Sequence, residues 1–136
     1  MKEINATIFT GISRFGNENN AYATTIYIDK KCVNLPPCTV YGKNSNHALY
    51  LRALYSALCQ IAESCPAETK CLVSFSTNDS VLLYEWKNQD FSDDIDLWQA
   101  IKRLLNKYPK LNLEIKTTLL EGVVSSEVRR GKRKSA

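Results

Sequence analysis

The longest stretch of helical periodicity in the chain lies between residues 46 and 65. Apolar residues recur there every three or four positions, which places them on one face of an amphipathic helix. These residues are Leu51, Leu54, Leu58, Ile61 and Cys65. Ser45 or Asn46 can accept hydrogen bonds from the first free amides of the helix, and Pro66 ends it. The apolar face of such a helix must pack against a sheet or another helix.

Runs of alternating, β-branched and aromatic residues on both sides of this helix predict strands. The predicted strands cover residues 4–13, 21–31, 38–41, 70–76 and 111–120. Short turns separate the first three, one rich in Gly and Asn and the other containing two prolines, so these strands are predicted to form an antiparallel meander. The run at 70–76 is short and mostly apolar, which is typical of a strand buried on both faces.

Two more helices are predicted after the fourth strand. The polar residues 77–80 can cap a short helix that runs through Trp86. A longer amphipathic helix carries apolar residues at helical spacing and stops at Pro109. Its apolar positions are Ile95, Trp98, Ile101, Leu105 and Tyr108. A final helix can begin within residues 123–133. The fold class expected from this order is α/β, a mixed five-stranded sheet in which the meander is followed by two crossover strands, with helices on both faces.

The charge of the chain is concentrated at one end. The 136 residues are 44% hydrophobic and carry a formal charge of +4, with 18 basic and 14 acidic residues. Five of the basic residues lie in the last eight positions; they are Arg129, Arg130, Lys132, Arg133 and Lys134. We therefore predict one near-neutral domain over residues 1–128 and a basic tail over 129–136. Such a tail can be a phosphate-binding arm, a nuclear-import signal or a solvated disordered end.

Neither a secretory signal nor a membrane span is expected, because no apolar run has the required length and flanks. The pattern favours a soluble intracellular protein, cytoplasmic or nuclear. The five cysteines are an odd number without a CxxC pair. Cys59, Cys65 and Cys71 are expected to be buried, reduced thiols. A zinc site is not expected, since the only histidine, His47, lies away from these cysteines.

Several stretches, taken in order, resemble the ribonuclease H-like superfamily. They are IFTGIS with the Gly/Asn loop after it, AYATTIYI, KNSNHALYLRALYSAL, SFSTNDS and DIDLWQAIKRLL before a strand. The segment from Asp94 to Trp98, with its helix, is a further marker. The similarity spans nearly the whole chain and implies the ribonuclease H fold, with the final helix short or missing.

The resemblance also implies a catalytic site of four carboxylates that hold two magnesium ions, one activating a water and one stabilising the leaving oxygen of a phosphodiester. Gly11 stands where the first carboxylate is expected, and Tyr50 where the second is expected. Asp79 fits the third position. Only Glu121 and Glu127 lie near the fourth, and the histidine-bearing loop before the last helix is absent. At best two of the four carboxylates remain.

This count predicts a degenerate, non-catalytic member of the superfamily. Asp79 is the only residual catalytic candidate, and at its position a helix cap is the more ordinary role for an aspartate. Asp29 is interpreted as a solvated acid at a strand end. No metal or other cofactor is expected, except Mg²⁺ if the domain is active.

Two functions without catalysis stay open, together with one enzymatic alternative. The first is binding of RNA or an RNA/DNA hybrid through the basic tail and other cations, namely Arg14, Lys30, Lys31, Lys43 and Arg52. The second is docking of a protein partner or a second copy of the chain, as in a replication complex, a mobile element or a virus. The alternative is an active magnesium-dependent endonuclease that cuts RNA/DNA hybrids. Five tyrosines, at positions 22, 27, 41, 50 and 55, are interpreted as sheet and core residues.

Overall fold

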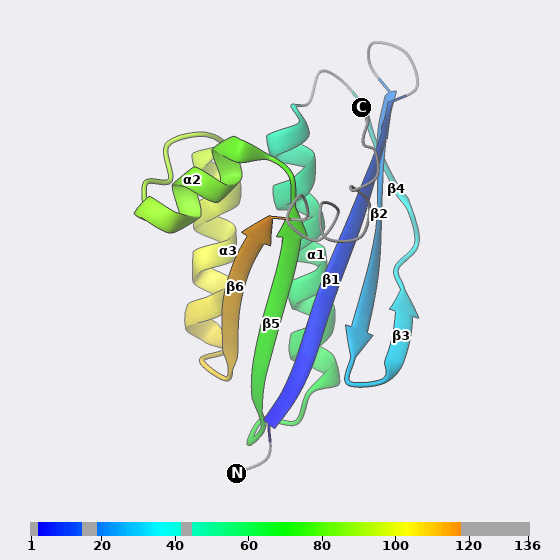
Figure 1. Cartoon of the computed structure of the whole chain (residues 1–136), viewed down its shortest axis with the longest axis vertical. Coiled ribbons are helices and arrows are strands. Elements are labelled where there is room, and N and C mark those ends of the chain that lie inside the picture. Colours follow the sequence, from blue (N-terminus) through cyan, green and yellow to red (C-terminus); the bar gives the residue numbers. More distant parts are fainter. Residues whose placement is uncertain (1–2, 15–18, 42–44, 118–136) are drawn as a thin grey trace, which may run out of the picture.

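A computed structural model describes residues 3–14, 19–41 and 45–117, which form a six-stranded mixed sheet and three helices (Figure 1). The strands are β1 (Glu3–Arg14), β2 (Asn19–Ile28), β3 (Lys31–Asn34), β4 (Cys38–Tyr41), β5 (Lys70–Thr77) and β6 (Leu111–Thr117). The helices are α1 (Asn46–Ser64), α2 (Ser80–Asn88) and α3 (Ile95–Lys107). The α/β class and the mixed sheet are confirmed. In the described part of the chain, no helix is both long and apolar enough to cross a membrane.

The strand order is β3-β2-β1-β5-β6, and β4 also pairs with β2. β1 pairs antiparallel with β2 and parallel with β5, and β5 pairs parallel with β6. The predicted five-stranded count is wrong by one. The predicted strand at 21–31 folds back at Asp29 and Lys30, and the chain then continues as β3. Asp29 adopts a φ of 54° in this turn, a conformation that Asp tolerates better than most residues.

Helix α1 covers the centre of the sheet as the hydrophobic pattern predicts. Ser45 caps its first turn, with its hydroxyl oxygen accepting the amide of Ala48 at 3.0 Å. The apolar stripe is buried without exception, from Leu51 to Cys65. In α3, Trp98 and Ile101 are fully buried, but Ile95 is 51% exposed. Ile95 begins its helix beyond the edge of the core, so its predicted place on the apolar face is wrong.

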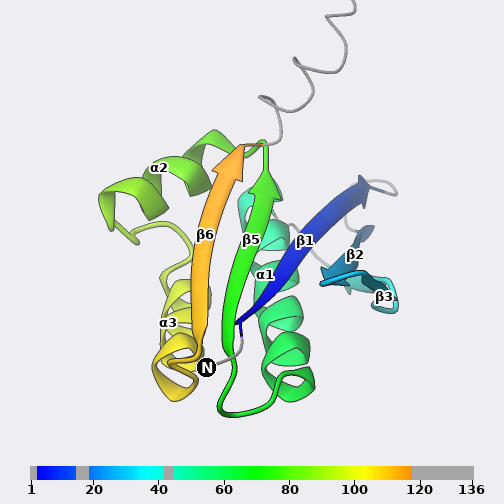
Figure 2. The same ribbon diagram turned by 60° about the horizontal axis from the view of Figure 1, so that its bottom comes forward.

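The two faces of the sheet differ. Helices α1 and α3 lie behind it on one face, and α2 lies beyond the ends of β5 and β6 (Figures 1 and 2). The side chains facing the helices include Ala6, Ile8, Ile26, Val73 and Phe75, all buried. On the opposite face Leu72 and Ser74 are half-buried and Ser76 is buried, so β5 is buried on both faces only near its carboxyl end. No helix of the described residues covers that face, and the predicted helix at 123–133 lies outside them.

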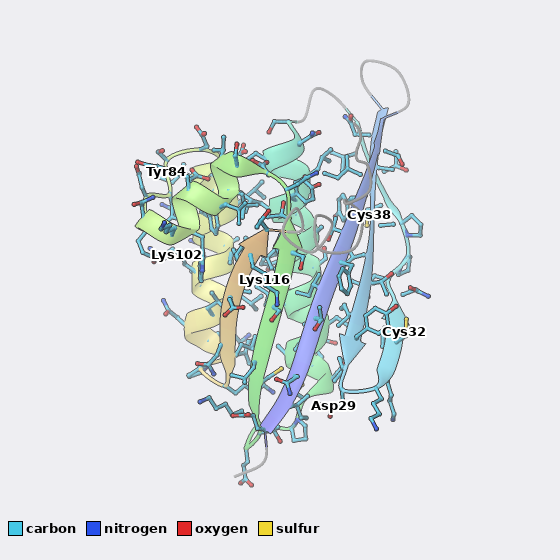
Figure 3. All side chains as sticks on the ribbon, in the orientation of Figure 1. Asp29, Cys32, Cys38, Tyr84, Lys102 and Lys116 are labelled. Carbon is cyan, nitrogen blue, oxygen red and sulfur yellow. The ribbon has the colours of Figure 1, made fainter. Side chains whose placement is uncertain are left out.

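The cysteines are all free thiols. Cys65 and Cys71 are buried with their sulfurs 3.9 Å apart, and Cys59 is half-buried. Burial raises the pKa of Cys71 to about 12, and the neighbouring Cys65 adds to this effect. Cys32 and Cys38 are exposed on the outer strands β3 and β4 (Figure 3). Cys65 and Cys71 are thus buried as predicted, at the junction of α1 and β5, whereas the predicted burial of Cys59 is wrong.

Lys110 holds the carboxyl end of α1 against the start of β6. Its ammonium donates to the carbonyls of Ala62 and Cys65 at 2.9 and 2.5 Å. These carbonyls belong to the last turn of a helix, where the backbone lacks its own donors and a cation is favoured.

We expect Lys110→Met to lower the free energy of unfolding by roughly 1–3 kcal/mol, because charge-assisted hydrogen bonds to a helix end are lost while the side-chain stem is kept. Urea denaturation at pH 7 measures this change. Lys107→Met is the matched control, since Lys107 is exposed in the last turn of α3. Equal stability of the two variants would show that Lys110 does not anchor α1.

Candidate functional site

The polar groups singled out by the sequence lie around the ends of β1 and β5 and the first turns of α1. In sheets with parallel strands, ligands bind most often at the carboxyl ends of the strands. Here β1 and β5 run parallel, so their ends approach the same edge of the sheet. The loop from Thr77 to Ser80 and the start of α1 meet at this edge.

Gly11 lies on β1, opposite Ala23 of β2. It is exposed on the face away from α1 and α3, and a Cβ added there would meet no atom within 4 Å. A side chain would thus fit, but glycine supplies no ligand atom. The first expected carboxylate position therefore has room for a side chain but provides no metal ligand.

Tyr50 projects from the second turn of α1 toward the loop after β5. Its hydroxyl donates to Asn78 Oδ1 at 3.0 Å, and its ring packs edge-on against Phe75 with centroids 6.5 Å apart. Burial raises the pKa of Tyr50 above its ordinary value, and the negative charge of Asp79 raises it further. The group at the second expected position is therefore a neutral phenol engaged with an amide.

Asp79 is the amino-terminal cap of α2. Its Oδ1 accepts the amides of Val81 and Leu82 at 3.0 and 3.3 Å. Its own amide donates to Thr77 Oγ1 at 3.1 Å. The position that the sequence predicts for a residual ligand thus holds a carboxylate that is already satisfied by backbone donors.

The residues present do not fit a two-magnesium group. Magnesium prefers several oxygen ligands with at least one or two carboxylates, and Gly11, Tyr50 and Asp79 offer one carboxylate between them. Among the described residues, no group of three or more His, Cys, Asp or Glu side chains is placed to hold a metal. Glu121 and Glu127 lie outside the described residues.

A buried ionic network lies next to this location, and the sequence did not predict it. His47, in the first turn of α1, is buried between two carboxylates. Its Nδ1 lies 2.6 Å from Asp94 Oδ2, and its Nε2 contacts Glu85 Oε1. Glu85, only 2% exposed on α2, also accepts the indole N–H of Trp98 at 3.0 Å and the amide of Asp93 at 2.9 Å. The network joins α1, α2 and the segment that leads into α3.

Two carboxylates surround the ring of His47. Both ring nitrogens face carboxylate oxygens, and the imidazolium form can donate to both of them. Burial by itself lowers the pKa of His47, but the hydrogen bonds to Asp94 and Glu85 and the charge of Glu85 outweigh it and raise the pKa above its ordinary value. The raised pKa favours the imidazolium form, in which His47 pairs with two acids.

Asp94 reaches His47 through a left-handed backbone conformation, with a φ of 52°, and its side chain makes no hydrogen bond to cap α3. The network explains the sequence marker at Asp94 and Trp98. Asp94 contacts His47, and Trp98 donates its indole N–H to Glu85. The signal that could have found the network is Glu85, a glutamate on the apolar side of α2, six positions before Phe91, which packs on Trp98. A lone histidine carries no such signal.

The remaining predicted residues divide into exposed and undescribed ones. Asp29 is exposed, and its Oδ1 accepts the amide of Asn5 at 3.2 Å, as fits a solvated turn acid. Lys30, Lys31 and Arg52 are exposed. Tyr22 is buried, Tyr50 is half-buried, and Tyr27 is a sheet residue of β2 that is 43% exposed. Tyr55 is 39% exposed on α1, so its interpretation as a sheet or core residue is wrong. The side chains of Arg14, Tyr41 and Lys43, and the basic residues 129–134, lie outside the described part.

No protein-family model matches this chain, and no curated protein matches it by sequence. Solved structures match it in fold. LC11-RNase H1, a metagenomic protein from compost crystallised in complex with an RNA/DNA hybrid, gives a TM-score of 0.60 at 18% identity, over 81% of this chain and 83% of that one. RNase H1 from the archaeon Halobacterium salinarum gives 0.55 at 17%, over 85% and 83%. The N-terminal RNase H domain of Rv2228c from Mycobacterium tuberculosis gives 0.59 at 12%, over 83% and 86%. The chain has a ribonuclease H-like fold, which confirms the predicted resemblance.

We expect the free energy of unfolding to fall as the pH rises above about 6.5. The pKa of His47 is raised in the folded state, so its stabilisation is complete below the unfolded value and is lost as the pH passes through the folded value. Urea denaturation from pH 5.5 to 9 measures the slope. The single histidine also allows its folded pKa to be read by NMR.

The variant His47→Gln should remove this slope and lower stability at pH 6 by about 3 kcal/mol, because Glu85 stays buried without its cation. Asp96→Asn is the control, since Asp96 is exposed two residues from Asp94. A pH slope in His47→Gln as steep as in the unmodified protein would assign the effect to other groups.

Proposed function

We propose that this ribonuclease H-like domain binds nucleic acid without cutting it. The observation that carries the second half, the absence of cutting, is the pair of residues found at the expected metal site. Gly11 offers no ligand, and Tyr50 offers a phenol that already donates to Asn78. Two-metal phosphodiester cleavage needs a concentrated negative charge to hold both ions, and this location lacks it in the described residues.

Nucleic-acid binding is supported by fold and charge together. A similarly folded protein, LC11-RNase H1, is known in complex with an RNA/DNA hybrid. In this chain Lys30, Lys31 and Arg52 are exposed cations, and the basic residues 129–134 follow the last described strand. Lysine and arginine side chains neutralise phosphates and release counterions, which supplies most of the free energy of non-specific binding.

A protein-docking function is the second candidate, and exposed apolar residues on α2 favour it. Val81 and Tyr84 lie one helical turn apart, and they are 43% and 60% exposed. Aromatic residues with this exposure are enriched where proteins meet. Sedimentation at micromolar concentration without nucleic acid tests this candidate for self-association. If the unmodified chain and the Tyr84→Ser variant are both strict monomers, the chain does not self-associate through α2.

The binding proposal predicts a steep salt dependence. We expect the affinity for a labelled 18-base-pair RNA/DNA hybrid to fall strongly between 50 and 200 mM salt, as measured by fluorescence anisotropy. Removing residues 129–136, which hold five basic residues, should flatten the logarithmic salt slope by several units. A flat salt response of the full chain, or no binding at 50 mM salt, would contradict the proposal.

The proposal that the domain does not cut nucleic acid predicts no hydrolysis of the same hybrid. The test incubates the hybrid for hours with Mg²⁺ and an excess of protein. The informative control is Asp79→Asn, which keeps an oxygen to cap α2 while removing the remaining carboxylate charge. Magnesium-dependent cleavage by the unmodified chain that disappears in Asp79→Asn would establish an active nuclease instead.

A further inference from the structure

The open face of the sheet carries an aromatic pair at its centre. Phe9 on β1 and Tyr27 on β2 contact each other edge to face, with ring centroids 5.8 Å apart and an interplanar angle of 82°. They are 40% and 43% exposed. In the described part of the chain, both helices that pack on the sheet lie on the other face (Figure 2). β1 lies between β2 and β5, where an exposed phenylalanine needs an explanation.

The exposure of the pair leaves aromatic surface available to a ligand. In an edge-to-face contact one ring presents its edge to the partner, so both faces of that ring are free of the partner. Cross-strand packing of the two rings does stabilise the β1–β2 pair. This packing does not by itself account for the exposure of the Phe9 ring on a central strand.

Beside the pair the sheet is nearly bare of side chains. Gly11 and Ala23 face each other in register, followed by Ser13 and Ala21. Nothing lies within 4 Å of the point where a Cβ of Gly11 would be. A planar group can therefore lie flat on this floor and reach the rings of Phe9 and Tyr27.

A row of polar groups crosses the sheet at the level of Phe9. On one side Thr25 pairs in register with Phe9, and its hydroxyl donates to Asn34 Oδ1 at 2.8 Å. On the other side Ser76 pairs with Lys116 of β6. The hydroxyl of Ser76 is buried and makes no hydrogen bond among the described residues. Lys116 projects on the side of the sheet away from α1 and α3 (Figure 3).

The charge on this row suits a phosphate backbone. Lys116 is exposed. Glu114 is the acid on the same face of β6, one row further from the strand ends, in register with Ser74. A nucleic-acid strand that crosses the sheet along the row of Phe9 and Ser76 thus passes Lys116, whereas Glu114 lies in the neighbouring row.

We infer that the open sheet face binds single-stranded nucleic acid, with bases stacked on Phe9 and Tyr27 and a phosphate near Lys116. This inference rests on the proposed function and names the form of nucleic acid it takes. Aromatic side chains on a sheet surface stack unpaired bases, and stacking needs a base whose face is not already covered by a neighbour. A duplex offers no such base, so the single strand is the preferred ligand.

The test compares a labelled 12-nucleotide RNA, the same DNA sequence and an RNA/DNA hybrid in anisotropy titrations at 100 mM salt. Phe9→Leu and Tyr27→Leu keep apolar bulk but remove the aromatic face. We expect each to weaken binding of both single strands about tenfold, with hybrid binding much less affected. Lys116→Gln should weaken single-strand binding and lower the logarithmic salt slope by about one.

Tyr55→Leu is the matched control, because Tyr55 is 39% exposed on α1, which lies on the other face of the sheet. It should bind as the unmodified protein does. Urea denaturation of each variant verifies that it is folded.

If the unmodified chain binds and the Phe9 and Tyr27 variants bind equally well, the inference is wrong and the proposed function stands. If the unmodified chain binds no nucleic acid, both are wrong. Loss of a homodimer in Phe9→Leu, without a change in RNA binding, would reassign this face to protein contact.

Discussion

The arrangement of the three helices depends on a buried histidine held between two acids. His47 lies in the first turn of the helix that covers the sheet, Glu85 belongs to α2 and Asp94 precedes α3. Burying one of these charges alone would cost several kcal/mol, and pairing offsets that cost only when the geometry satisfies every group. Here Trp98 and the amide of Asp93 supply the further donors that Glu85 needs. The three helices are consequently fixed relative to one another by direction-dependent contacts as well as by the apolar core.

This network also shapes the neighbouring site. It sets the start of α1, and one turn later the same helix delivers Tyr50 to Asn78. At an expected metal-ligand position the helix thereby holds a phenol that is hydrogen-bonded to a loop amide. The fold can form with Gly11 and Tyr50 at the expected carboxylate positions, because helix packing and those positions rest on different residues.

The parts of the fold that were predictable are those set by local pattern. The stripe from Leu51 to Cys65, the cap at Asp79 and the stop at Pro109 each depend on neighbours in sequence, and each lies where it was expected. The turn at Asp29 escaped prediction because neither Gly nor Asn marks it. The site was predictable only by comparison with a family pattern, which located Gly11 and Tyr50 but not their contacts. The His47 network joins residues 38 and 47 positions apart, and no periodicity encodes such a pairing.

The outer edge of the sheet at β3 and β4 has a consequence for how this domain can associate. Both strands are four residues long, and Leu35, Pro36 and Pro37 separate them along the edge of β2. Proline lacks the amide hydrogen that a strand ladder requires, and short interrupted strands cannot template a long partner strand. Growth of the sheet by strand addition is therefore blocked on this side. A partner that approaches β3 and β4 must therefore be recognised through side chains, and backbone pairing with another strand is disfavoured at this edge.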